Sequence, residues 1–153
     1  MKNLMTITLI GTLATAPLAL AQTRVDQIEP FISAGTDYGI SQFRSIEFDD
    51  DHYDDVELEG WTNDWYVELD LNGDASIRKE ERRKYQREPY GLSAQEVRNY
   101  LEAASAEGMH TVEEIKIDRR GEVDIEGEDS SDRELELEFR NGELKPIRIE
   151  RDD

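Results

Sequence analysis

Residues 70–81, DLNGDASIRKEE, decide the fold of this chain, because they fit two incompatible structures. In the first, Asp70, Asn72, Asp74 and Glu81 take positions 1, 3, 5 and 12 of a calcium-binding EF-hand loop. In the second, Asn72-Gly73 forms the tight turn of a β-hairpin between two segments of alternating hydrophobicity. The first structure is a calcium site between helices, whereas the second is part of a β-sheet.

The rest of the sequence contains an internal repeat. Residues 28–48, IEPFISAGTDYGISQFRSIEF, align at a constant offset with residues 97–117, VRNYLEAASAEGMHTVEEIKI. The segment VELEG at 56–60 also matches VDIEG at 123–127. Because so many apolar and glycine positions agree, we interpret the pattern as a duplication.

The repeat favours the hairpin over the calcium loop. Asn72-Gly73 corresponds to Asn141-Gly142, so the turn occurs in both copies. Phe139 stands where the first copy has Asp70, so the calcium ligands occur in only one copy. Ala75 occupies position 6 of the supposed loop, where an EF-hand needs glycine for its sharp turn. We therefore predict a hairpin without a cofactor, and keep calcium binding as the alternative.

Each copy is predicted to begin with a helix and to continue as strands. Ser93 and Glu96 form a capping box before a helical stripe of apolar residues. That stripe is Val97, Tyr100, Leu101 and Ala104, and its counterpart in the first copy is Val25, Ile28, Phe31 and Ile32. Segments such as ELELEF at 134–139 alternate with the period of a half-buried strand.

The predicted fold is therefore α+β, with two repeated units. Each unit is an N-terminal helix followed by an antiparallel β-meander of about four strands. The first unit covers residues 24–82 and the second covers residues 93–151. The polar segment 83–92, which contains proline and glycine, is the linker between them.

The start of the chain and its charge indicate where the protein acts. Residues 1–21 have the basic start, short apolar run and small-residue cut site of a signal peptide, which predicts a periplasmic or secreted protein. No membrane span is expected after cleavage, and the chain has no cysteine. Its formal net charge of −19 opposes binding to nucleic acid and favours cations or basic proteins.

The order of these segments resembles the PepSY family of small exported modules. The resemblance is clearest over residues 93–151, in VEEIKID, GEVDIEG and RELELEFRNGELKPIRIE, and a weaker copy covers roughly 24–82. It implies an antiparallel sheet covered by a helix, and a domain without catalysis. It also implies a module that binds or restrains another protein, often a peptidase.

Few residues are candidates for a functional site. Trp61 and Tyr66, in the segment GWTNDWY, are candidate anchors for a protein partner. His52, within the acidic segment DDDHYDD, and His110 are interpreted as surface residues. No nucleophile–base pair and no phosphate-binding loop before a helix is recognisable, so an enzyme is not predicted.

Overall fold

The computed structural model describes residues 24–48, 55–84 and 87–152. The predicted signal peptide over residues 1–21 and the acidic segment around His52 lie outside these residues. Within the described ranges, no helix is both long and apolar enough to cross a membrane.

The described residues form two helical segments and eight strands. A 3-10 turn, η1 (Arg24–Ile28), leads into helix α1 (Glu29–Tyr38), and helix α2 (Ala94–Ala106) precedes the second half of the strands. The strands are β1 (Gln42–Phe48), β2 (Asp55–Trp61), β3 (Tyr66–Asn72), β4 (Ile77–Arg83), β5 (Met109–Ile117), β6 (Glu122–Asp129), β7 (Glu134–Arg140) and β8 (Arg148–Arg151).

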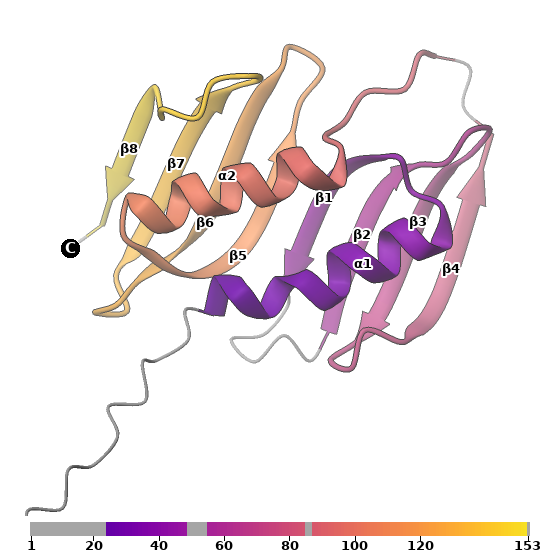
Figure 1. Cartoon of the computed structure of the whole chain (residues 1–153), viewed down its shortest axis with the longest axis horizontal. Coiled ribbons are helices and arrows are strands. Elements are labelled where there is room, and N and C mark those ends of the chain that lie inside the picture. Colours follow the sequence, from indigo (N-terminus) through magenta and orange to yellow (C-terminus); the bar gives the residue numbers. More distant parts are fainter. Residues whose placement is uncertain (1–23, 49–54, 85–86, 153) are drawn as a thin grey trace, which may run out of the picture.

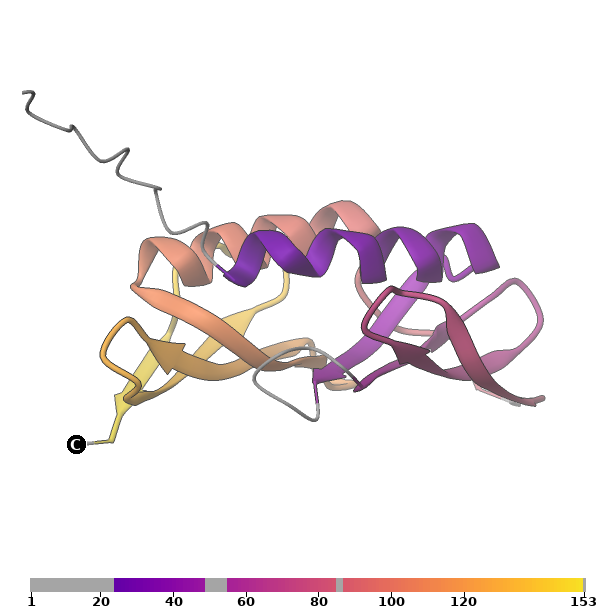
Figure 2. The same ribbon diagram turned by 90° about the horizontal axis from the view of Figure 1, so that it is seen from below.

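The prediction of two repeated helix-plus-meander units is wrong. The eight strands form one antiparallel sheet in the order β4-β3-β2-β1-β5-β6-β7-β8, and both helices lie on the same face of it (Figures 1 and 2). Strands β1 and β5 join at the centre of the sheet, where Ile46 lies opposite Ile115. Both side chains are buried, so the two halves share one core. Periodicity identifies a strand but not its neighbour, which is why the sequence did not reveal this pairing.

The core lies between the sheet and the helices. Along β2, β3, β6 and β7, every second residue is buried against the helices. Both predicted helical stripes are also buried, from Val25 to Ile32 and from Val97 to Ala104. The predicted capping box at the start of α2 is present, because Ser93 Oγ accepts a hydrogen bond from the Glu96 amide and the Glu96 carboxylate accepts one from the Ser93 amide.

The glycines that end VELEG and VDIEG lie where two backbones approach closely. A Cβ atom at Gly127 would lie 2.0 Å from the carbonyl oxygen of Thr111, and one at Gly60 would lie 2.6 Å from that of Gln42. Both glycines are opposite irregular register positions, in the neighbouring strands β5 and β1. Glycine is therefore required here for lack of space, and this explains why the motif occurs twice.

Leu137→Ala should test the position of β7 in the core. The Leu137 side chain is fully buried, so its truncation should lower the free energy of unfolding by roughly 2–5 kcal/mol. The control is Leu144→Ala, because Leu144 is 51% exposed and its loss should change the stability little. Equal effects of the two substitutions in urea unfolding would contradict the inward orientation of Leu137.

Candidate functional site

The two faces of the sheet differ in chemistry. Helices α1 and α2 cover one face, and we call the other the open face (Figure 2). Successive side chains of a strand point to opposite faces of the sheet, so the apolar residues face the helices and the charged residues face the open side. For example, Leu135 and Leu137 of β7 are buried, whereas Glu136 between them faces the open side.

The strand register places seven carboxylates in one line across the open face. Each lies directly opposite the next on the neighbouring strand, and we call the line the acidic row. From β3 to β8 its members are Asp70, Glu57, Glu47, Glu114, Glu126, Glu136 and Glu150. Neighbouring strands are about 4.8 Å apart, so the row is roughly 29 Å long. Like charges directly opposite each other destabilise a sheet, so the row opposes folding.

Basic residues lie mainly at the edges of the sheet. The four central strands, β2, β1, β5 and β6, carry eleven acidic residues but only two basic ones, Arg44 and Lys116. The edge strands β4 and β8 carry six basic residues and three acidic ones. At one end of the acidic row, Lys79 of β4 lies 3.9 Å from the carboxylate of Asp70. The centre of the open face is thus the most negative part of the described sheet.

Lys116 is the main cation near the centre of the row. Its Nζ lies 2.6 Å from a carboxylate oxygen of Glu114 and 3.1 Å from one of Glu126. Burial disfavours the charge of Lys116, but the hydrogen bonds to the two glutamates outweigh this effect and raise its pKa. This lysine therefore stays charged at neutral pH and neutralises part of the row.

Three carboxylates on the open face also have raised pKa values. For Glu57 the largest cause is burial, followed by the charges of Glu68, Glu59, Glu47 and Asp70. Burial also raises the pKa of Asp124, with Glu138 adding to the effect and Lys116 opposing it. Glu136 follows the same pattern, with burial first and then repulsion from Glu150 and Glu126. Each of these groups would gain from a cation placed beside it.

A hollow of about 340 Å³ lies at the centre of the open face. Its walls come from β1, β2, β5 and β6 and from Tyr90 of the segment before α2. Glu57 lies on one side and Asp124 on the other, and both line the hollow. Arg119 also lines the hollow, and its guanidinium lies 4.6 Å from the centre of the Tyr90 ring in a cation–π contact.

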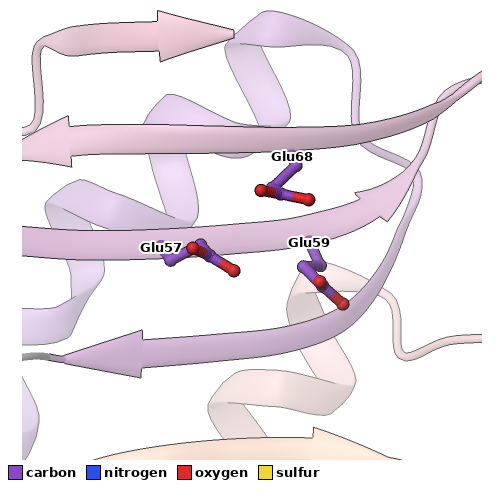
Figure 3. A group of neighbouring side chains, drawn as sticks. All are labelled: Glu57, Glu59 and Glu68. Carbon is purple, nitrogen blue, oxygen red and sulfur yellow. The ribbon is translucent and has the colours of Figure 1, made fainter. Parts of the chain in front are cut away.

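One group of carboxylates on the open face is close enough to share a metal ion. Glu57 and Glu59 of β2 and Glu68 of β3 each offer an oxygen, and these oxygens lie within 4.8 Å of one another (Figure 3). A set of oxygen ligands suits a hard cation such as Ca²⁺. However, Arg44 lies 2.6 Å from Glu59, and Tyr66 and Ser45 also donate hydrogen bonds to that carboxylate. One of the three ligands is therefore already engaged within the protein.

Trp61 and Tyr66, the predicted partner anchors, are not exposed. Each is only 4% exposed, and their ring centres are 5.0 Å apart in an edge-to-face contact. The Tyr66 hydroxyl donates to Glu59 and accepts from Arg44, while Arg83 covers the ring at 4.8 Å. Burial, with the Glu59 carboxylate, raises the pKa of Tyr66 to about 12. Both residues belong to a packed cluster at one end of the open face, so neither has the exposed surface that a partner anchor would use.

The residues of the proposed calcium loop lie on a β-hairpin. Asp70 is in β3, opposite Lys79 of β4, and Glu81 also bonds Lys79 at 2.8 Å. Asp74 Oδ1 accepts a hydrogen bond from the Ser76 amide at 3.0 Å, inside the turn. Strands, not helices, flank the turn, so the predicted hairpin is confirmed for the backbone and the EF-hand geometry is absent.

The hairpin turn differs in detail from the predicted Asn72-Gly73 turn. The Ala75 amide donates to the Asn72 carbonyl at 2.8 Å, and the Asn72 amide donates to Ser76 at 2.9 Å. Ala75, with φ of 62°, takes the left-handed position, and Gly73 does not. The same bonding closes the turn at 118–122, where Gly121 has φ of 83°. In both turns the residue just before the closing residue takes the left-handed conformation, so the length of the turn decides which residue this is. The Asn-Gly pair alone did not reveal the length of the turn.

The sequence contained a signal for the acidic row, but not its register. Alternating glutamates in VELEG, VDIEG and ELELEF predict one acidic face for each strand. Which glutamate lies opposite which depends on strand pairing and on the register shifts in β1 and β5. The row across seven strands was therefore missed.

No protein-family model and no curated protein matches the sequence. Among solved structures, a candidate lipoprotein from Clostridium difficile 630 is similar, with 14% sequence identity and a TM-score of 0.45. The match covers 85% of this chain and 93% of that chain. An identity and a TM-score this low leave the function to be argued from the residues of this chain.

Calcium titration should show no stoichiometric site at residues 70–81. Asp70 and Glu81 are both paired with the ammonium of Lys79 on the hairpin, so Asp70→Ala should leave the calorimetric titration unchanged in moderate salt. Salt should reduce any diffuse binding to the acidic face. A one-to-one micromolar site that Asp70→Ala abolishes would contradict the hairpin interpretation.

Glu57→Gln should stabilise the protein at neutral pH. The pKa of Glu57 is higher in the folded chain than in the unfolded chain, so the folded chain holds the proton of this carboxyl more tightly. This proton stabilises the fold fully at a pH below the unfolded pKa, and the stabilisation is lost as the pH rises through the folded pKa. Removing the charge should raise the free energy of unfolding by about 0.2–1 kcal/mol at neutral pH. The gain should disappear near pH 3, where carboxylates are protonated.

The matched control for this substitution is Glu102→Gln on α2. It removes one negative charge from the exposed surface of the helix layer, away from the open face. Chemical denaturation of both variants across the pH range measures the difference. An equal gain for both would assign the effect to net charge and not to the acidic row.

Proposed function

We propose that this protein is exported and that it binds a basic segment of another protein across the open face of its sheet. The signal-peptide features of residues 1–21 support export. The acidic row supports the binding surface and the chemistry of the partner. The proposal assigns no reaction to this face.

The acidic row carries the proposal because it works against the fold. Glu57 lies directly opposite Glu47 on one side and Asp70 on the other, and no ion pair joins it to a described residue. Replacing one of these carboxylates by a neutral side chain would relieve repulsion at no cost to the core. Residues that reduce stability without a structural role are typical of binding sites, where function maintains them.

Electrostatics selects a positively charged partner. A surface that holds seven carboxylates in line attracts basic side chains and accelerates their association at low salt. It repels nucleic acid and anionic lipid for the same reason. Cations such as Lys79 and Arg148 lie at the two edges of the sheet and mark the limits of the negative region. The partner therefore needs basic residues that reach the centre of the face.

The spacing of the row favours a helical segment of the partner. Its carboxylates are about 4.8 Å apart. An α-helix with one basic residue per turn presents a cation every 5.4 Å or so along its axis. In an extended strand the side chains of one face are roughly 6.6 Å apart, so they match the row less well. A basic helix laid across the strands therefore makes contact with more of the row.

The resemblance of residues 93–151 to PepSY modules supports a protein as the partner. In that family the partner is often a peptidase, so we include an exported peptidase with a basic surface helix among the partners to be tested. The low exposure of Trp61 and Tyr66 moves the contact surface from these aromatic residues to the acidic row.

Peptide binding tests the proposal directly. A labelled helical peptide with one arginine per turn on one face should bind in fluorescence anisotropy, and added salt should weaken the binding. The double substitution Glu57→Gln and Glu136→Gln should weaken it roughly three- to tenfold, because each removes one ion pair across the interface. Thermal unfolding should show that the same variant is at least as stable as the wild type.

Two controls make this result specific. Glu102→Gln removes a charge from the helix layer and should leave peptide binding unchanged. A peptide of the same composition with its arginines distributed around the helix should bind less tightly. Binding that no open-face substitution weakens would overturn the proposal.

A further inference from the structure

We infer that edge strand β8 (Arg148–Arg151) pairs with β8 of a second copy and joins two molecules into one continuous sheet. The inference goes beyond the proposed function, because it concerns the edge of the sheet, although Glu150 belongs both to β8 and to the acidic row. It begins from the distribution of exposed apolar side chains. Of the four exposed large hydrophobic residues in the described part of the chain, three lie beside this edge, namely Leu144, Ile147 and Ile149.

The backbone of β8 is available for pairing. The Asp152 amide donates to the Glu134 carbonyl of β7, which places residues 148, 150 and 152 in the hydrogen-bonded pairs with that strand. By alternation, the amide and carbonyl groups of Ile149 and Arg151 point away from β7. No described strand lies on that side. Unpaired groups of this kind form a template for an added strand.

The side chains of β8 are self-complementary in an antiparallel arrangement. If Ile149 of one copy lies opposite Ile149 of the other, then Arg148 of each copy lies opposite Glu150 of the other copy. Both opposite-charge pairs fall at non-hydrogen-bonded positions, where side chains on neighbouring strands are closest. The two isoleucines meet on the helix-covered face, where Ile149 is 39% exposed in the single chain.

The other edge of the sheet is less self-complementary. In β4 (Ile77–Arg83), the central register places Lys79 opposite Glu81 of the second copy, but it also pairs Glu80 with Glu80 and Arg78 with Arg82. These like-charge contacts are unfavourable. Six of the seven residues in β4 are charged, a composition that protects sheet edges from pairing. The second copy is therefore assigned to β8.

The β8 pairing also relieves charge on the open face. Glu150 is the last carboxylate of the acidic row, and in the single chain Arg148 of the same strand bonds it. In the pair, Arg148 of the second copy lies directly beside Glu150 and continues the row with a cation. The whole molecules still repel each other, since each has a formal net charge of −19. The pairing should therefore be weak and should strengthen as salt screens this repulsion.

Sedimentation velocity over a concentration series tests the inference. The wild type should show a monomer–dimer equilibrium that shifts to dimer with added salt. Arg148→Glu places like charges opposite each other twice and should weaken the dimer roughly tenfold, and Glu150→Arg should do the same. The double substitution Arg148→Glu with Glu150→Arg restores both opposite-charge pairs and should restore the dimer.

A substitution at the opposite edge provides the control. Lys79→Glu changes the charge of β4 as Arg148→Glu changes that of β8, and it should leave the dimer intact. Circular dichroism should show that all variants are folded. A wild type that stays monomeric throughout, a double variant that fails to recover, or a dimer lost with Lys79→Glu would each overturn the inference.

Discussion

The pairing of β1 with β5 is the contact on which the rest of the structure depends. Only three register pairs form it, Ser45 with Lys116, Ile46 with Ile115 and Glu47 with Glu114. The isoleucine pair is fully buried and links the two halves of the core. On one side of it, the pair of Glu47 with Glu114 joins the two halves of the acidic row. On the other side, Ser45 lies opposite Lys116, which is the main cation near the row. Without this contact the chain would have two short sheets, and no surface would carry carboxylates across seven strands.

The two faces of the sheet oppose each other energetically. Buried leucine, isoleucine, valine and phenylalanine side chains on the helix-covered face each stabilise the fold by about 1.5–3 kcal/mol. On the open face, cross-strand pairs of carboxylates such as Glu57 with Asp70 and Glu126 with Glu136 reduce that stability. Lys116 and the arginines of the edge strands offset part of the repulsion. The protein therefore tolerates a surface that is unfavourable for folding because its core is continuous.

The sequence predicted local structure well and long-range structure poorly. The helical stripes around Phe31 and Leu101 and the capping box at Ser93 follow from side-chain spacing alone, and the structure confirms them. The single sheet does not follow, because strands β1 and β5 are separated by three other strands and a helix in the chain. The same limit applied to the candidate site. Tyr66 alternates with buried residues as a surface residue would, yet Glu59 and Arg44 from two other strands enclose it.

The central pairing also has a kinetic consequence. Every other pairing between the strands joins neighbours in sequence through a turn or a short connection, so each forms within a local stretch of chain. Ile46 and Ile115 must instead meet across about seventy residues, and closing a loop of that length costs roughly 4 kcal/mol in chain entropy. Contacts distant in sequence slow folding. Assembly of the central pair is thus the step expected to limit the folding rate, after hairpins such as β6–β7 have formed.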